Sequence, residues 1–275
     1  MEVLKDKYQK IWKLKRLSLL EKTQTSHIYR CESKQGDSIL KILTDMGVKD
    51  ELSGTHFLRN FNGIGCAKLF EFDNRALVLE YIDGNNLYQF SKMGHENKAS
   101  KEFVAIIKKL RTKKIIEDPL KFNSLSSYQD IFEKVIFPND LNELMEQGEY
   151  LFKKLLATSS DEVLLHGDLH HENVKSRCSG EFVCFDPKGV IGDPSYELAT
   201  TLKNPWDFPD ISEDSESFKS RARYFSRELN LPLSRIIGFA YAHLALSIAW
   251  AIEEGCSYLH QKNLIKKLEL MLPKL

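Results

Sequence analysis

The chain has 275 residues, a length that allows one or two domains and a large hydrophobic core without disulfide or metal cross-links. Its 39 Lys and Arg residues balance its 39 Asp and Glu residues, which argues against a protein that binds nucleic acid or an anionic membrane through a basic surface. The five cysteines contain no Cys-x-x-Cys pair and the first residues are too charged for a secretory signal, so we expect a cytoplasmic protein with reduced thiols.

The first third of the chain has the pattern of a small sheet with one helix. Short apolar segments separated by polar turns predict strands. The segment 49–61 interrupts them, and Leu52, His56 and Leu58 recur there at roughly the 3.6-residue spacing of a helix. We therefore expect a five-stranded antiparallel sheet with one inserted helix. The predicted strands are residues 17–20, 28–31, 38–43, 67–72 and 76–82.

After the Asp83-Gly84 turn the pattern changes to long helical periods, with only brief strand signals near residues 163–165 and 182–185. This change predicts two lobes, residues 1–82 and 83–275. The segment 236–252 is apolar enough to approach the length of a membrane span, but it contains His243 and Ser247, and we interpret it as a buried core helix. The predicted helices are residues 101–114, 127–136, 140–157, 216–230 and 234–254.

The densest group of reactive side chains lies in VLLHGDLHHENV (163–174) and FDPKGVIGDP (185–194). Asp168 follows an apolar strand, Asn173 comes five residues later, and Asp186 begins a second turn after another strand. A carboxylate that accepts a hydroxyl proton, together with an amide oxygen and a second carboxylate that reach a metal, are the groups that phosphoryl transfer requires. The order and spacing therefore predict a phosphoryl-transfer site.

These motifs resemble the aminoglycoside phosphotransferase family, and within it the streptomycin 6-phosphotransferases and hydroxyurea phosphotransferase-like proteins. The resemblance is carried by HGDLHHEN (166–173), DPKGVIGDPSYELA (186–199) and LKNP (202–205). It implies an α+β, bilobal protein-kinase-like fold with a nucleotide-binding lobe over residues 1–82 and a mostly helical catalytic and acceptor-binding lobe over 83–275. It also implies transfer of the γ-phosphate of ATP, with Mg²⁺, to a hydroxyl of a small molecule such as streptomycin.

The same resemblance implies roles for single residues. Asp168 is the expected catalytic base, Asn173 and Asp186 are the expected metal ligands, and Lys41 is the expected phosphate-binding lysine. We choose Glu51 as the carboxylate that holds Lys41, although Asp50 is adjacent. The further expected contacts to the nucleotide are Ser26 in the first turn and Glu80 and Ile82 between the lobes.

Four carboxylates are candidates for the acceptor side. Asp193 and Glu197 match family positions that either hold the catalytic loop or line the acceptor site. Glu253 and Glu254 follow the apolar helix and are candidate contacts for a cationic acceptor. An acidic run over residues 207–216 is either a solvated loop or a negative rim beside such an acceptor. We expect no nucleic-acid or membrane partner, and the sequence does not predict the oligomeric state.

Three alternatives remain open at this point. The first alternative is a metabolic sugar or amino-alcohol kinase. The second is a nucleotide-binding protein with little turnover, and the glycine-free turn over residues 22–27 favours this second alternative. The third alternative is a metal-dependent hydrolase, suggested by His166, His170 and His171. Hydrolytic zinc sites usually place their histidines on one helix face instead, as in H-E-x-x-H.

Overall fold

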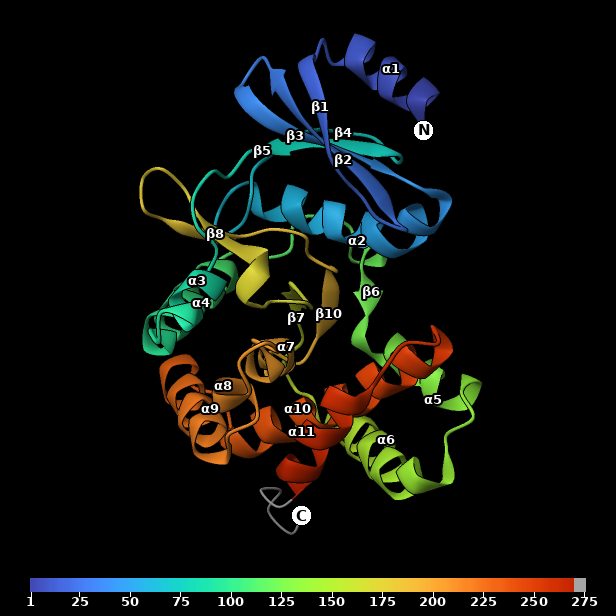
Figure 1. Ribbon diagram of the computed structural model, residues 1–275, viewed down its shortest axis with the longest axis vertical. Helices are drawn as coiled ribbons and strands as arrows, with labels where there is room; N and C mark the ends of the chain where they lie inside the picture. The colour runs from blue at the N-terminus through green and yellow to red at the C-terminus, as the bar shows by residue number, and fades with distance from the viewer. Residues whose placement is uncertain (270–275) are drawn as a thin grey trace.

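The computed structural model describes residues 1–269, with a sheet-containing lobe at one end and a helical lobe at the other (Figure 1). The connection between the lobes runs from the end of the fifth strand at Glu80 to the helix that begins at Tyr88. The predicted boundary between residues 82 and 83 falls in this connection.

The N-terminal lobe contains the predicted five-stranded antiparallel sheet, in the order β1-β2-β3-β5-β4. The helix α1 (Glu2–Ile11) was not predicted, because only Tyr8 of its residues is buried. The Tyr8 ring stacks on Trp12, and its hydroxyl donates to Asp73 at 2.9 Å in the turn between the last two strands. The strands are β1 (Lys15–Lys22), β2 (Ser26–Ser33), β3 (Gly36–Leu43), β4 (Leu69–Phe72) and β5 (Ala76–Glu80).

The helix α2 (Asp45–Phe61) lies between the sheet and the C-terminal lobe (Figure 1). It begins four residues before the predicted start, because the Thr44 hydroxyl accepts a hydrogen bond from the Gly47 amide at 3.1 Å and caps the helix. A Cβ atom at Gly47 would lie 1.9 Å from the Thr25 carbonyl oxygen, and one at Gly54 would lie 1.8 Å from the Pro187 carbonyl oxygen. Only glycine therefore lets α2 contact both the first hairpin turn and the C-terminal lobe this closely.

The C-terminal lobe is built around α10 (Leu233–Glu253), which packs against α6 (Asn142–Ala157), α7 (Glu197–Lys203) and α11 (Leu259–Glu269). By length and composition α10 would be able to cross a membrane, but most of it is buried in this lobe, as the interpretation as a core helix predicted. The other helices are α3 (Tyr88–Lys92), α4 (Glu96–Arg111), α5 (Asp130–Lys134), α8 (Pro209–Ser212) and α9 (Ser215–Leu229).

Two predictions about this lobe were wrong in detail. The segment 127–136 is a 3₁₀ turn (Leu125–Gln129) followed by the short α5, and Val135 is already extended. The acidic run 207–216 is not a loop throughout, because α8 lies within it and Asp214 caps α9 by accepting from the Ser217 amide at 2.7 Å.

Five very short strands frame the polar loops of the C-terminal lobe. The order β6-β10-β7 forms one small sheet, and β8 pairs with β9. β7 and β9 were predicted, whereas β8 and β10, which are equally short at three residues each, were not. The strands are β6 (Asn123–Ser124), β7 (Val163–Leu165), β8 (Val174–Ser176), β9 (Phe182–Cys184) and β10 (Val190–Gly192).

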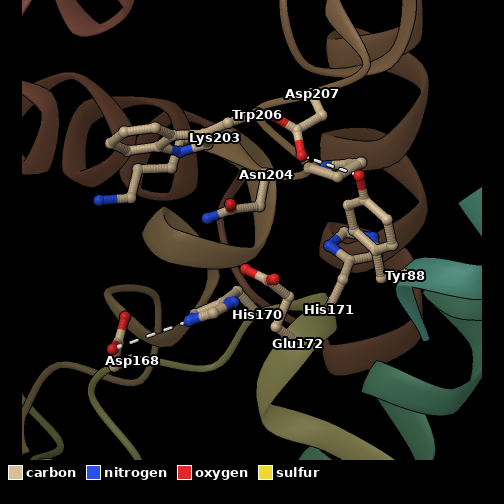
Figure 2. A pocket seen from close by; sticks show the side chains of 10 residues that line it. Tyr88, Asp168, His170, His171, Glu172, Lys203, Asn204, Trp206 and Asp207 are labelled. Carbon is tan, nitrogen blue, oxygen red and sulfur yellow. Dashed lines mark hydrogen bonds and ion pairs between the residues drawn. The ribbon is translucent and has the colours of Figure 1, made fainter. Parts of the chain in front are cut away.

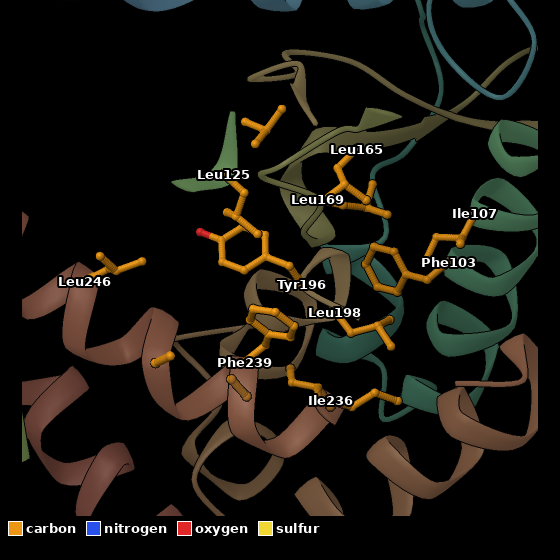
Figure 3. Close-up of a cluster of buried hydrophobic side chains, with 14 of the residues drawn as sticks. Phe103, Ile107, Leu125, Leu165, Leu169, Tyr196, Leu198, Ile236, Phe239 and Leu246 are labelled. Atoms are coloured by element: carbon orange, nitrogen blue, oxygen red, sulfur yellow. The ribbon is translucent and has the colours of Figure 1, made fainter. Parts of the chain in front are cut away.

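The hydrophobic core anchors the loop that follows β7. Leu165 and Leu169 lie on either side of the His166-Gly167-Asp168 turn and both are buried in the cluster that contains Tyr196 and Phe239 (Figure 3). Burying a leucine side chain stabilises a fold by roughly 1.5–3 kcal/mol. The polar turn is therefore fixed at both ends by apolar packing.

Candidate active site

Two cavities lie on the two sides of the 166–173 loop. The interlobe cavity, of about 350 Å³, lies beneath the sheet and is lined by Lys41, Ile82, Asn173 and Asp186, among others. The C-lobe cavity, of about 360 Å³, is lined by ten residues, with Asp168 on its wall (Figure 2). The loop is thus a shared wall that presents Asp168 to one cavity and Asn173 to the other.

Lys41 lies on β3 and forms an ion pair with two carboxylates, one from each lobe. Its ammonium contacts Glu51 of α2 and lies 2.5 Å from Asp186 Oδ1. Burial alone would lower the pKa of Lys41, but the two carboxylates outweigh it and the pKa lies above its ordinary value. The structure therefore places Glu51, and not the adjacent Asp50, beside Lys41.

His166 and Glu197 hold the loop from beneath. The two oxygens of the Glu197 carboxylate accept from the amides of His166 and Gly167 at 2.7 and 3.0 Å. The His166 ring accepts from the Asp168 amide at 3.2 Å through Nδ1 and donates to the Phe185 carbonyl at 2.9 Å through Nε2. Burial lowers the pKa of His166 to about 4, so the ring is neutral and ties the 166–173 loop to the loop that carries Asp186.

Asn173 and Asp186 offer oxygens that fit a divalent cation. The Asn173 amide nitrogen lies 3.0 Å from both the Asp168 carbonyl and His170 Nε2, and no residue in 1–269 donates to its Oδ1. Asp186 has a half-exposed side chain and a backbone φ of +60°, a region uncommon for residues other than glycine. Burial alone would raise the pKa of Asp186, but Lys41 keeps it below its ordinary value. One carboxylate and one amide oxygen suit Mg²⁺, which takes its remaining ligands from phosphate and water.

The segment between the lobes presents backbone groups to the interlobe cavity. Ile82 is buried and lines this cavity, and its amide donates to no acceptor in the part of the chain that the structure describes. The Glu80 carboxylate is held by Arg177 at 2.7 and 2.8 Å, and the Glu80 amide donates to the Lys68 carbonyl at 2.9 Å, so neither group is available to a ligand. An unpaired amide at this place fits a planar heterocycle with a hydrogen-bond acceptor.

Several predicted site residues lie elsewhere. Ser26 is buried, and its hydroxyl lies 3.2 Å from that of Thr23 within the turn, so it does not line the interlobe cavity. Asp193 is buried and forms an ion pair with Arg235, where an acceptor cannot reach it. Glu253 and Glu254 are exposed at the end of α10, and neither lines the C-lobe cavity.

The histidines on both sides of Asp168 are not arranged as a zinc site. His171 is buried, and its Nε2 lies 3.2 Å from the Glu96 carboxylate, which also pairs with Arg221. Both ring nitrogens of His166 already form hydrogen bonds. Within residues 1–269 no group of three or more His, Cys, Asp and Glu side chains is placed to hold a metal ion. The hydrolase alternative therefore lacks a ligand set.

The C-lobe cavity also contains residues to which the sequence analysis assigned no role. Tyr88 donates to Asp207 at 2.8 Å at one end of the cavity, and Lys203 with Trp206 lies at the other (Figure 2). Of the acidic run, only Asp207 lines this cavity. The motif LKNP marked Lys203 by resemblance, but only the folded chain brings Tyr88 to the same place.

Replacing Glu197 by Gln is expected to lower kcat about 10- to 100-fold, because the new NH₂ group faces an amide N–H and shifts the loop that carries Asp168. Burial raises the pKa of Glu197 to about 7, although the two backbone hydrogen bonds act to lower this pKa. Protonation removes one amide acceptor, so wild-type kcat should fall as the pH drops below 7. Steady-state pH profiles of the wild type, of Glu197→Gln and of the exposed control Glu133→Gln check this. An unchanged kcat in Glu197→Gln would contradict it.

Comparison with known proteins gives one family and several related folds. A family model described as aminoglycoside/hydroxyurea antibiotic resistance kinase matches residues 11–255. The streptomycin 3''-kinase of Klebsiella pneumoniae is 24% identical over 252 residues, covering 89% of this chain and 91% of that protein. The streptomycin 6-kinase of Streptomyces griseus is 23% identical over 209 residues, covering 72% of this chain and 66% of that protein.

Solved structures share the fold at lower identity. Choline kinase LicA from Streptococcus pneumoniae matches with a TM-score of 0.70 and 16% identity, covering 98% of both chains. The aminoglycoside phosphotransferase APH(4)-Ia, in a ternary complex with ADP and hygromycin B, matches with a TM-score of 0.69 and 12% identity, covering 99% of this chain and 98% of that one. These likenesses confirm the predicted α+β, kinase-like architecture.

Proposed function

Because the chain belongs to the aminoglycoside/hydroxyurea antibiotic resistance kinase family, we propose that it transfers the γ-phosphoryl group of ATP to a hydroxyl group of a small cationic sugar of the aminoglycoside kind. The observation that carries this proposal is the loop shared by two cavities. Asp168 faces one cavity while Asn173 and Asp186 face the other, so an acceptor and a nucleotide bound in the two cavities would meet at this loop.

The interlobe cavity is the proposed nucleotide site. The Ile82 amide, which has no acceptor within residues 1–269, would donate to the adenine ring, and the Lys41 ammonium, held by Glu51, is placed to neutralise phosphate oxygens. Asn173 and Asp186 would hold Mg²⁺, which would supply positive charge to offset that of the phosphate groups. Positioning and charge neutralisation supply most of the catalysis in phosphoryl transfer.

Asp168 is the proposed catalytic base. Its carboxylate lines the C-lobe cavity, and its amide is fixed by His166. A carboxylate held in this way orients an acceptor hydroxyl and accepts its proton as the bond to phosphorus forms. Glu197 and His166 take no part in the proton transfer; they hold the loop so that Asp168 stays in place.

The lining of the C-lobe cavity supports a cationic acceptor. Three carboxylates, those of Asp168, Glu172 and Asp207, outnumber the single ammonium of Lys203. The Tyr88 ring adds a flat surface on which a sugar or a guanidinium group stacks, whereas the Trp206 ring is already stacked on His260. The curated relatives named for streptomycin agree with this chemistry.

The test is Mg²⁺-dependent ATP consumption with a panel of aminoglycosides, hydroxyurea, simple sugars and amino alcohols. We expect turnover stimulated by an aminoglycoside and lost in Asp168→Asn. Turnover with a plain sugar or an amino alcohol alone would favour a metabolic kinase. Binding of ATP with no acceptor-stimulated turnover would instead favour a nucleotide-binding protein, and both results contradict the proposal.

A further inference from the structure

Lys203, the last residue of α7, places an ammonium group in the C-lobe cavity without a carboxylate partner. Its Nζ donates to His243 Nε2 at 3.0 Å and to Ser247 Oγ at 2.9 Å, and lies 5.5 Å from the centre of the Trp206 ring. Among residues 1–269 no Asp or Glu oxygen lies within 4.0 Å of it. Both hydrogen-bond partners of this cation are therefore neutral, and the Asp168 carboxylate of the same cavity acts on it only through its charge, which opposes the lowering of the Lys203 pKa by burial.

His243 does not share the charge. Its ring is 4% exposed, and its Nδ1 lies 2.7 Å from the Tyr196 hydroxyl, which is also buried. Burial, together with the neighbouring ammonium, holds the pKa of His243 well below its ordinary value. Burial likewise lowers the pKa of Lys203, to about 8, so the ammonium remains mostly charged at neutral pH.

Within residues 1–269, the contacts of the fold leave one hydrogen of this cation without an acceptor. An ionised group taken from water into an apolar setting destabilises the protein unless an opposite charge or complete hydrogen bonding compensates it. Two of the three ammonium hydrogens have acceptors, one each from His243 and Ser247, and the third is left for the cavity that Lys203 lines. A ligand oxygen in the cavity would complete the set.

We propose that Lys203 is a specificity-determining residue, which donates its third hydrogen to an acceptor oxygen near the phosphorylated hydroxyl and excludes an acceptor with an ammonium group at that place. This inference rests on the proposed function. Glu172 and Asp207 lie away from Lys203 in the same cavity, so the cationic groups of the acceptor bind there (Figure 2). The cavity thus selects an acceptor that has hydroxyl oxygens at one end and cationic groups at the other.

The first experiment needs no acceptor and measures the melting temperature of Lys203→Met. Methionine matches the length of the lysine stem without its charge. Removing the desolvated charge offsets the loss of the two hydrogen bonds to His243 and Ser247, so we expect a melting temperature close to that of the wild type. A clear drop in melting temperature, absent from the exposed control Lys98→Met, would show that the ammonium serves the fold and would overturn the proposal.

The second experiment measures kcat and KM with the acceptor that the wild type uses. We expect Lys203→Met to raise the acceptor KM about 10- to 100-fold, the effect of losing a charged hydrogen bond, while the KM for ATP stays unchanged. Lys203→Arg should restore part of the affinity. We also compare this acceptor with an analogue in which the hydroxyl next to the phosphorylated one is replaced by an amine. Lys203→Met should reduce the ratio of the two kcat/KM values.

An unchanged acceptor KM, or an unchanged preference between the two acceptors, would overturn the assignment of Lys203. Failure of the proposed function has a different signature, because the wild type itself would then show no acceptor-stimulated ATP turnover. In that case the melting temperature still decides whether the ammonium serves the fold.

Discussion

The Asp168→Asn variant is expected to lose about 10³-fold in kcat while it binds ATP normally. Asparagine keeps the size of the side chain and leaves the Asp168 amide bonded to His166, so the loop should keep its shape. It removes the carboxylate that accepts the hydroxyl proton, and general-base catalysis contributes roughly 10²–10⁴-fold. Acceptor-stimulated ATP consumption measures the loss, and nucleotide titration measures the binding.

The matched control is Asp161→Asn, an exposed residue shortly before β7 with no side-chain partner in the described part of the chain. It should behave as the wild type. Wild-type turnover in Asp168→Asn would remove Asp168 from the mechanism. A parallel loss of ATP affinity would mean that the substitution had disturbed the interlobe cavity instead.

The Lys41→Met variant is expected to lose about 10²–10³-fold in kcat/KM for ATP, the usual effect of removing one charged group from a developing phosphate charge. It should also be less stable, because Glu51 and Asp186 then face each other without the ammonium between them. Breaking a buried ion pair from one side costs about 3–5 kcal/mol, and the half-exposed Asp186 places this case at the lower end.

A double variant separates the loss of activity from the loss of stability. Lys41→Met combined with Glu51→Gln removes one of the two facing carboxylates, so we expect most of the stability to return and the activity to stay low. Lys15→Met, on the exposed strand β1 of the same sheet, is the control. Recovery of activity in the double variant would show that Lys41 acts through the fold and not on the nucleotide.

The sheet and the inserted helix α2 of the N-terminal lobe were predictable because their signals are local, whereas α1 was not. Alternating apolar segments and turns mark the five strands, and Lys41 lies on the third of them. The choice of Glu51 over Asp50 needed the register of α2, which the Thr44 cap sets and the apolar periodicity did not show. Asp168, Asn173 and Asp186 were identified as candidates because they occur in two motifs that follow each other closely in the sequence.

The acceptor side was not predictable, because its residues come from distant parts of the chain. Tyr88, Lys203 and Asp207 lie after the lobe connection, at the end of α7 and before α8, and only the packing of the helices brings them to one cavity. An ion pair that forms only in the folded chain also explains why Asp193 is not on the acceptor side. Asp193 is polar and close in sequence to the site, but Arg235 on α10 holds it in a buried ion pair.

The close backbone contacts of α2 bear on how the enzyme is controlled. Gly47 fits against the Thr25 carbonyl and Gly54 against the Pro187 carbonyl, and the Ser53 hydroxyl donates to the Gly189 carbonyl at 2.5 Å. Because α2 contacts the first hairpin turn at one end and the C-terminal lobe near its middle, it has no room to move away from β3. The contact between Lys41 and Glu51 is therefore permanent and does not act as an on–off switch. We therefore expect an enzyme that is always assembled, whose output follows the supply of its acceptor.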